Sequence, residues 1–506
     1  MRRSDGSREI GGCLMMLLAI AVAGCGPSQL PAEERKPASA PAAAKESAVE
    51  QQLPDEAPNE VEAAKAAPDA LPPEGKLWTR KKGGDWPTFL GPSGDSKSPE
   101  KGILTTWPAG GLKIVWQKPL GTSYGSPTIS HGRLYQFDRF GDMARVYCLN
   151  AETGQELWRY EFPTEYEDRY YYNNGPRCSP IVDGERVYAY GVEGMLVCVN
   201  AITGKPIWKI DTAKEFGVVQ NFFGNGSNPV VEGDLLIAMV GGSPPDSYDV
   251  FRAVGNGSGI VAFDKLTGEV KYKITDELAS YASLKLAKID GRKWCFAFCR
   301  GGLVGFEPAS GIVDFHFPWR ARNPESVNAS VPVVVGNQVF ISETYGPGSA
   351  LVAVSPGKYE VVWRDDERKR QKAMQTHWNT PIELDGYLYA SSGRHLSEAE
   401  LRCIEWKTGK VLWSEPGLTR SSLTYIDGHF LVLAELGELL LVKATPEKYE
   451  LVAKMGLAPR RAGPLREGSS ASEVGADPFW AAPVVSHGLV YIRGGGKLRC
   501  LELIPE

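Results

Sequence analysis

The chain has 506 residues and a formal net charge of −5, with a pI near 5.9, so it has no basic excess that would favour nucleic acid as a partner. Its nine cysteines include no adjacent pair, no CxxC and no CxxCH, which excludes common zinc, redox and haem-attachment motifs. Hydrophobic residues make up 42% of the chain, enough for a large core.

The first 24 residues have the pattern of an export signal. Three arginines precede an apolar run from Cys13 to Ala23, which is too short to span a bilayer but suits a signal-peptide core. Val22 to Cys25 resembles a bacterial lipobox, in which the cysteine is lipidated and becomes the new N-terminus. We therefore expect a lipoprotein signal peptide over residues 1–24 and a lipid anchor on Cys25. The alternative is an ordinary signal with a chance cysteine.

Residues 25–84 are dominated by Pro, Ala, Glu and Lys. Such a composition cannot bury enough apolar surface to offset the entropy of ordering, which predicts a disordered tether. A coil of this length has a root-mean-square reach of roughly 40–45 Å. A globular body carried on this tether would therefore stand off the membrane.

From residue 85 onward the sequence is organised by a repeat. Residues 125–158 contain four short apolar runs separated by turn residues, which predicts a four-stranded antiparallel unit. Almost the same pattern returns at 179–208, and the number of copies then defines the fold. We find eight openings of the unit, at Pro127, Pro180, Pro229, Ala282-Ser283, Pro332, Pro381, Ser421-Ser422 and Pro483. A hairpin glycine follows each, at Gly132, Gly184, Gly233, Gly291, Gly336, Gly386, Gly428 and Gly488.

The eighth unit has only three strands before the chain stops at Glu506, while an unassigned strand, Ile114 to Trp116, precedes the first unit. Pairing this strand with the last unit closes a ring and removes an open sheet edge. The sequence thus predicts an all-β protein, an eight-bladed β-propeller over residues 85–506, closed by an N-terminal strand.

The repeated Ser-Pro, Gly-x-Val-Tyr, Leu-x-Cys-Leu-Asn-Ala, Thr-Gly and Trp elements resemble the pyrroloquinoline-quinone (PQQ) repeat of quinoprotein-like propellers. The resemblance covers residues 112–506. It implies that the Thr-Gly turn and the Trp dock each blade onto the next. The segment Gly84 to Pro92 resembles the lead-in of such proteins and is expected to pack against the disc.

The resemblance implies two functions of different classes. One branch, BamB-like, comprises non-enzymatic outer-membrane assembly-factor lipoproteins. The other comprises PQQ- and calcium-dependent dehydrogenases, which have a disulfide between adjacent cysteines, an Asp base and Glu/Asn calcium ligands. Because this chain has no Cys-Cys pair, that disulfide cannot be carried over. A carbohydrate-binding propeller is a third alternative, since aromatic-rich loops suit sugars.

Four cysteines, Cys148, Cys198, Cys403 and Cys500, occupy the same slot of the repeat, in the third strand of a unit. A residue that recurs at one structural position indicates packing, and free cysteine behaves as a small buried hydrophobe. We expect core thiols rather than a metal or redox site.

The candidate binding surface is the face that carries the connections between blades and the second-to-third-strand loops. These loops are rich in aromatic residues and Arg, which are favoured at binding hot spots. The alternative is that they only cover the disc. The candidate residues are Tyr170, Tyr171, Tyr172, Asn173, Arg177, Phe223, Trp319, Arg320, Arg322, His377, Trp378, Arg394 and Trp480.

The sequence therefore predicts a non-enzymatic propeller of the cell envelope, anchored to the outer membrane through its lipid and facing the periplasm. We expect a monomeric body that binds an envelope protein or an extended ligand, with no catalytic residues, metal or cofactor. PQQ and calcium belong only to the dehydrogenase alternative.

Overall fold

A computed structural model describes residues 76–458 and 477–506 of the chain. The predicted signal peptide, Cys25 and the predicted tether up to residue 75 lie outside these described residues. These described residues belong to one compact unit. Within the described ranges, no helix has the length and apolar character needed to cross a membrane.

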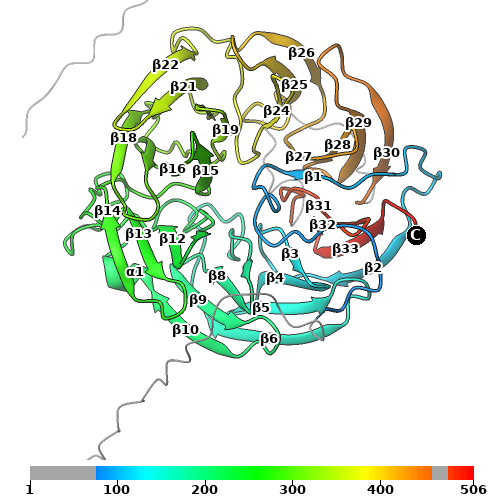
Figure 1. Cartoon of the computed structure of the whole chain (residues 1–506), viewed down its shortest axis with the longest axis horizontal. Coiled ribbons are helices and arrows are strands. Elements are labelled where there is room, and N and C mark those ends of the chain that lie inside the picture. The colour runs from blue at the N-terminus through cyan, green and yellow to red at the C-terminus, as the bar shows by residue number, and fades with distance from the viewer. Residues whose placement is uncertain (1–75, 459–476) are drawn as a thin grey trace, which may run out of the picture. The chain divides into compact units, whose positions relative to one another are not determined.

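The compact unit is a ring of eight sheets, each with a meander of four antiparallel strands. Figure 1 shows the first strand of each blade near the centre of the ring and the last at its rim. The predicted eight-bladed propeller is confirmed. In chain order, the blades contain the following strands: β3 (Thr128–Ser130), β4 (Arg133–Phe140), β5 (Met143–Asn150), β6 (Glu156–Pro163); β7 (Ile181–Asp183), β8 (Arg186–Tyr190), β9 (Met195–Asn200), β10 (Pro206–Asp211); β11 (Val230–Glu232), β12 (Leu235–Met239), β13 (Ile260–Asp264), β14 (Val270–Ile274); β15 (Lys285–Ile289), β16 (Arg292–Phe298), β17 (Gly302–Phe306), β18 (Val313–Pro318); β19 (Val333–Val335), β20 (Gln338–Ser342), β21 (Ser349–Ser355), β22 (Lys358–Arg364); β23 (Ile382–Leu384), β24 (Tyr387–Ser392), β25 (Glu400–Glu405), β26 (Val411–Pro416); β27 (Ser421–Ile426), β28 (His429–Ala434), β29 (Glu438–Lys443), β30 (Leu451–Gly456); β31 (Val484–Ser486), β32 (Leu489–Gly494), β33 (Lys497–Glu502).

The eighth blade is completed by β2 (Ile114–Pro119), which runs antiparallel to β33. This pairing confirms the predicted closure of the ring by an N-terminal strand. A further two-residue strand that the sequence did not reveal, β1 (Lys97–Ser98), pairs in parallel with β27. A single turn of helix, α1 (Thr212–Phe216), follows β10 and is capped by Asp211, whose side chain accepts the Lys214 N–H.

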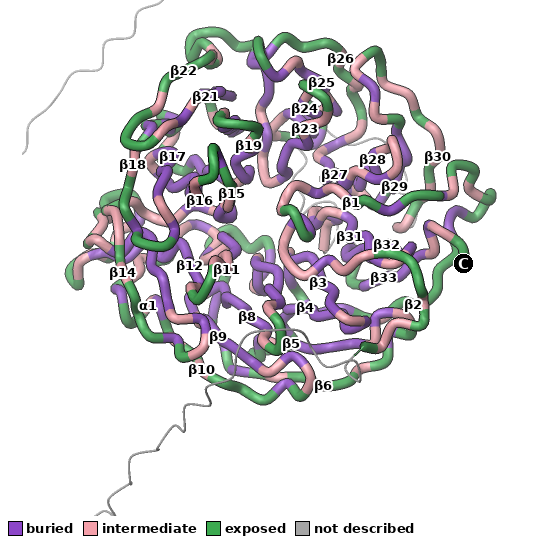
Figure 2. The backbone as a smooth tube through the Cα atoms, viewed as in Figure 1, coloured by how far each residue is buried: buried purple, intermediate pink, exposed green. Residues whose placement is uncertain are grey.

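Burial follows the position of a strand within its blade. The second and third strands of each blade are largely buried, because each blade is sandwiched between two others. The rim strands are mostly exposed or half-buried (Figure 2). In β10, for example, the pattern alternates along Pro206–Asp211. The glycines of the eight first hairpins all have positive φ, between 55° and 88°. Glycine is favoured in tight hairpin turns because it adopts this conformation without strain.

Neighbouring blades are docked by a repeated contact at the rim. In the first blade, the indole N–H of Trp158 donates to the carbonyl oxygen of Ala201 in the second blade, at 3.0 Å. The Thr-Gly turn of the second blade lies against the same ring, and a Cβ on Gly204 would come within 2.5 Å of it. This confirms the docking role that the repeat family implied. The indoles of Trp116, Trp208, Trp363 and Trp413 make the equivalent bond to the next blade.

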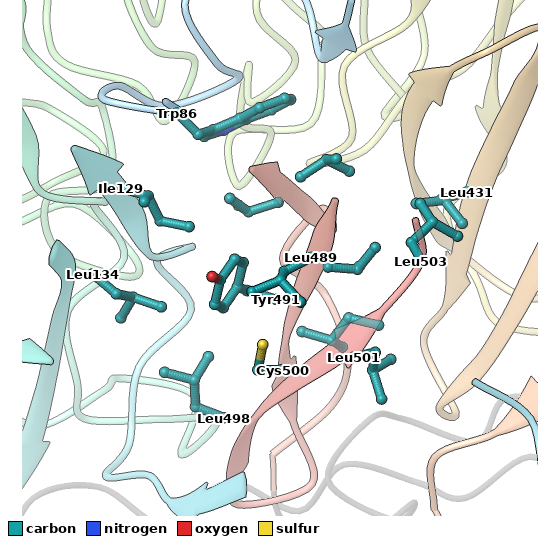
Figure 3. Packing of buried hydrophobic residues seen from close by; sticks show 14 of the residues in the cluster. Trp86, Ile129, Leu134, Leu431, Leu489, Tyr491, Leu498, Cys500, Leu501 and Leu503 are labelled. Carbon is teal, nitrogen blue, oxygen red and sulfur yellow. The ribbon is translucent and has the colours of Figure 1, made fainter. Parts of the chain in front are cut away.

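The hydrophobic core is divided into clusters that lie between adjacent blades. The largest of these joins the seventh, eighth and first blades and includes Leu431, Tyr491 and Leu134. Figure 3 shows how β32 and β33 place their apolar side chains between the flanking blades, with Trp86 alongside. Burial of this apolar surface is the main driving force that holds the ring together.

All seven cysteines of the described chain are unpaired and buried. Burial raises the pKa of each of these thiols, for example that of Cys198 to about 12, so they remain protonated and packed. For these residues the predicted role as core thiols is confirmed.

Candidate functional site

A cavity of about 430 Å³ lies at the centre of the ring, where the innermost strands begin. All eight blades contribute one residue from the same position, three before the proline (or the leucine in the fourth and seventh blades) that opens the innermost strand. The repeat therefore fixes the backbone around the cavity, while the side chain differs from blade to blade. The eight residues are Tyr124, Arg177, Gly226, Tyr281, Ala329, Trp378, Arg420 and Trp480.

Two residues after each of these eight positions the side chain is often polar, and most of these polar side chains also line the cavity. They form hydrogen bonds between neighbouring blades. Ser422 Oγ donates to the Trp480 carbonyl oxygen at 2.7 Å, and the amide of Asn228 donates to Ser283 Oγ at 2.8 Å. Thr380 Oγ1 accepts the Val331 N–H. These bonds hold neighbouring blades in register around the centre and use much of the polar capacity of this layer.

One end of the cavity is closed by residues 84–98, which we call the N-terminal segment. Its residues Phe89 and Leu90 line the cavity. Trp86 forms a two-way backbone bridge with Ile129 at 2.8 and 2.9 Å, and Lys285 Nζ donates to the Gly94 carbonyl oxygen at 2.6 Å. Five blades hold the segment through their innermost strands, at Ile129, Val182, Lys285, Tyr425 and Ser486.

The preceding residues 76–84 also contact the propeller, although the sequence predicts them to be tether. Trp78 stacks on His487 with ring centroids 4.0 Å apart, and Arg80 pairs with Glu502 at 2.7 Å. The side chains of this short stretch anchor it to the first and eighth blades. The sequence did not indicate this, because these residues directly follow a long stretch rich in Pro, Ala, Glu and Lys. The lead-in from residue 84 packs against the disc as expected.

A row of stacked rings forms one wall of the cavity, which we call the aromatic wall. The ring centroids of Tyr124 and Trp480 are 4.5 Å apart, and those of Trp480 and Trp378 are 4.4 Å apart. The guanidinium of Arg420 lies 4.4 Å from the Trp378 centroid and forms an ion pair with buried Glu435. Glu435 also accepts the Trp480 indole N–H at 2.7 Å, so this carboxylate fixes both the cation and the ring.

The tyrosine-rich loop after the first blade is organised by a buried carboxylate. Asp168 accepts the backbone N–H of Tyr170 at 2.9 Å and forms an ion pair with Arg177. Tyr172 is thereby placed between Trp480 and Phe223, with centroid distances of 6.2 and 5.9 Å. The loop extends the aromatic lining around the mouth of the cavity.

A second buried carboxylate shapes the loop after β20. Glu343 accepts backbone N–H groups from Tyr345, Gly346 and Gly348 at 2.7, 3.0 and 3.1 Å. Burial raises the pKa of Glu343 to about 7, although these hydrogen bonds act in the opposite direction. The loop places the Tyr345 hydroxyl 3.1 Å from His377 Nε2.

The electrostatics near His377 are positive. Burial lowers the pKa of His377 well below its ordinary value, and Arg420 and Arg394 lower it further, because both factors disfavour the charged imidazolium. Arg394 lines the cavity with its guanidinium 4.4 Å from the Tyr345 centroid. Within the described chain it contacts no carboxylate, unlike Arg177 and Arg420.

Comparison with known proteins identifies the family. The family described as "Outer membrane protein assembly factor BamB" matches residues 101–189 and 142–415, together more than half of the chain. The chain belongs to this family of PQQ-repeat propellers. No curated protein sequence matches it significantly.

Solved structures show the shared fold of this BamB-family chain. BamB from Moraxella catarrhalis is 13% identical, with a TM-score of 0.51, and the match covers 78% of this chain and 98% of that one. The computationally designed Ika8 protein (10% identical, TM-score 0.48, 77% and 98% covered) and a europium-containing methanol dehydrogenase (12% identical, TM-score 0.44, 71% and 90% covered) are more distantly similar.

The residues around the cavity do not fit the calcium ion of the dehydrogenase alternative. Calcium takes six to eight oxygen ligands, mostly from carboxylates and carbonyl groups. Among the cavity-lining residues Glu325 is the single carboxylate, and the amide of Asn228 is engaged by neighbouring blades. No group of three or more His, Cys, Asp or Glu side chains suited to a metal occurs in the described ranges.

The cavity brings together eight of the thirteen candidate residues of the BamB-family chain, and their role as a binding site stays a prediction. They come from five different connections of the chain. The eight are Tyr170, Tyr172, Arg177, Phe223, His377, Trp378, Arg394 and Trp480.

The other five candidates lie elsewhere. Trp319 is buried against Phe317 in the core, and Asn173 is buried, where its side chain accepts the Gly175 N–H. For these two, placement on an open face is corrected, because polar and aromatic loop residues also hold the loops themselves. Tyr171, Arg320 and Arg322 are exposed outside the cavity.

Sequence reasoning missed Tyr124, Tyr281 and Arg420. Each lies at the repeated position three residues before an innermost strand opens, so the register of the repeat was the available signal. The same register marks two cavity-lining residues with little or no side chain, Ala329 and Gly226, and the Tyr281 ring packs against Gly226.

Proposed function

We propose that this BamB-family chain is a non-enzymatic binding propeller of the bacterial cell envelope. It holds an envelope protein or a ligand on the face where the central cavity opens. The proposal includes a lipid anchor on Cys25 in the outer membrane and a monomeric, periplasm-facing body.

The observation that carries this proposal is the central cavity itself. It is closed at one end by the N-terminal segment, and its open side is lined by rings and guanidinium groups from many loops. Aromatic residues and Arg are the side chains enriched at binding hot spots, and concave, mainly apolar sites of this volume are typical of ligand pockets. The buried carboxylates Asp168 and Glu435 form ion pairs with Arg177 and Arg420, which leaves them unsuited to act as general bases.

Site-specific photo-cross-linking in intact envelopes tests which face binds. A photoreactive residue at exposed Tyr171 lies in the loop at the cavity mouth, whereas one at exposed Asp290 lies at a first hairpin on the opposite face. We expect a discrete cross-linked partner from position 171 and none from position 290. Cross-linking from position 290 alone, or the same products from both positions, would contradict the proposal.

The dehydrogenase alternative is tested separately with the purified full-length chain. Stoichiometric binding of PQQ in the presence of calcium, together with alcohol- or sugar-dependent dye reduction, would overturn the non-enzymatic assignment. We expect neither.

A further inference from the structure

The groups that are free to meet a ligand in the central cavity are few. The serine, threonine and asparagine side chains of its inner layer are engaged between blades. Arg177 and Arg420 are paired with Asp168 and Glu435. What remains for a ligand is aromatic surface, the guanidinium of Arg394, the side chain of His395, and two buried nitrogens without a partner in the described chain, His377 Nδ1 and Trp378 Nε1.

The position of Arg394 suits an anion. Its side chain is partly exposed, and within the described chain it contacts the ring of Tyr345 but no carboxylate. The carboxylate that lines the cavity, Glu325, accepts instead from the Tyr170 hydroxyl at 3.2 Å. A guanidinium that has no carboxylate partner can bind the carboxylate of a ligand through charge-assisted hydrogen bonds.

The shape of the cavity suits a ring. The aromatic wall lies on one side, and Gly226 and Ala329 replace large side chains at the equivalent positions of the third and fifth blades. Aromatic rings stack in offset or tilted arrangements, and the short side chain of Ala329 leaves room in the lining, whereas Tyr281 packs against Gly226. A neutral sugar, which needs many hydrogen-bond partners, meets an inner layer whose polar groups are largely committed.

We propose that the central cavity binds a small organic acid, with an apolar ring against the aromatic wall and a carboxylate paired with Arg394. This inference rests on the proposed binding function and specifies the chemical class of one ligand. It needs no chemistry on that ligand.

Calorimetric titration of the purified full-length chain with a matched pair of probes tests the inference. N-acetyl-L-tryptophan carries an indole and a carboxylate, and N-acetyl-L-tryptophanamide carries the same ring without the charge. We expect the acid to bind at least tenfold more tightly than the amide. D-glucuronate and D-glucose form the second arm, in which we expect at least tenfold weaker binding than that of the aromatic acid.

Three variants assign the binding to the site. Arg394→Gln is expected to weaken binding of the acid about tenfold, the effect of losing one charge-assisted contact, with little effect on the amide. Ala329→Leu fills the free space and is expected to weaken both probes. Arg322→Gln, at a side chain that is 97% exposed, is the control and should change neither. Thermal unfolding of each variant verifies that it is folded.

Equal affinity for the acid and the amide, or tighter binding of D-glucuronate than of the aromatic acid, would overturn the inference. An unchanged affinity in a folded Arg394→Gln variant would do the same. If cross-linking from position 171 succeeds while the acid fails to bind, the ligand class is wrong and the binding function stands.

Discussion

Trp158 and Tyr135, on two strands of the first blade, donate to the same buried carbonyl oxygen of Ala201 in the second blade, at 3.0 and 3.2 Å. The arrangement repeats where the ring closes, with Trp116 and Tyr491 donating to Ala151. It repeats again at Lys265, which accepts from Trp208 and Tyr188. One carbonyl oxygen with two donors is thus a standard joint between these blades.

This joint predicts a non-additive pair of substitutions. Trp158→Phe and Tyr135→Phe should each lower the free energy of unfolding by about 1 kcal/mol, because each leaves the Ala201 carbonyl with one donor. The double variant should lose at least about 1 kcal/mol more than the sum, since the buried acceptor then has no partner. Denaturant unfolding of the four proteins measures the coupling. Strict additivity would show that the shared acceptor does not matter.

The Thr-Gly turn predicts a steric effect that can be separated from backbone strain. Gly204 (φ 70°) and Gly428 (φ 74°) both have left-handed backbones, but a Cβ at Gly204 would meet the Trp158 ring whereas one at Gly428 meets nothing within 4 Å. Gly428→Ala should cost about 1 kcal/mol of stability from the backbone alone. Gly204→Ala should cost about 1–3 kcal/mol more, as overpacking does. Equal losses in urea titrations would argue against contact between turn and indole.

The buried carboxylate of Glu343 predicts a dependence of stability on pH. Its pKa of about 7 in the folded protein is higher than the roughly 4.3 of an unfolded chain, so the folded state binds this proton more tightly. The contribution is therefore fully present below about pH 4.3 and is lost as the pH rises to about 7. In Glu343→Gln, the fall in unfolding free energy between pH 5 and pH 8 should be smaller than in the parent by about 1–3 kcal/mol.

Thermal unfolding at the two pH values checks this prediction, with Glu185→Gln at an exposed hairpin position as the control. The control should reproduce the pH dependence of the parent. A Glu343→Gln variant that does the same would show that this carboxyl group ionises normally in the folded protein.

The proposed lipid anchor predicts the outcome of a single substitution. Cys25→Ser should abolish incorporation of labelled fatty acid and move the protein from the membrane to the soluble fraction of the envelope, because stable anchoring needs more than one acyl chain. The propeller should remain folded, with an unchanged unfolding midpoint. Continued acylation of the variant would refute the anchor. Cys13→Ser, within the apolar run, is the matched control and should remain membrane-bound.

The repeat made the fold predictable from the sequence, because the prolines and glycines that mark each blade are required by local backbone geometry. Ring closure by Ile114 to Trp116 was predictable for the same reason, since the last unit lacks one strand. The pairing of Lys97 and Ser98 with β27 was not predictable, because a two-residue parallel strand has no pattern of its own.

The candidate site was only partly predictable. Loop residues that do not repeat, such as Tyr172, were predicted as candidates. Tyr124 and Arg420 occupy a position that recurs in every blade, and they were not predicted. Their position recurs in each blade but the residue type at that position varies. Neither the residue type nor the length of the loop therefore marks them as lining the cavity. The interblade packing of Trp319 could not be inferred either, because it depends on contacts between segments distant in sequence.

The way in which the ring is closed also constrains the order of assembly. Arg80, near the start of the described chain, pairs with Glu502, which lies 422 residues later, and β2 pairs with β33. During synthesis from the N-terminus, Arg80 and β2 lack these two partners until the last blade has emerged. Contacts of such sequence separation form slowly, so we expect closure of the ring by the final blade to be the last step of folding.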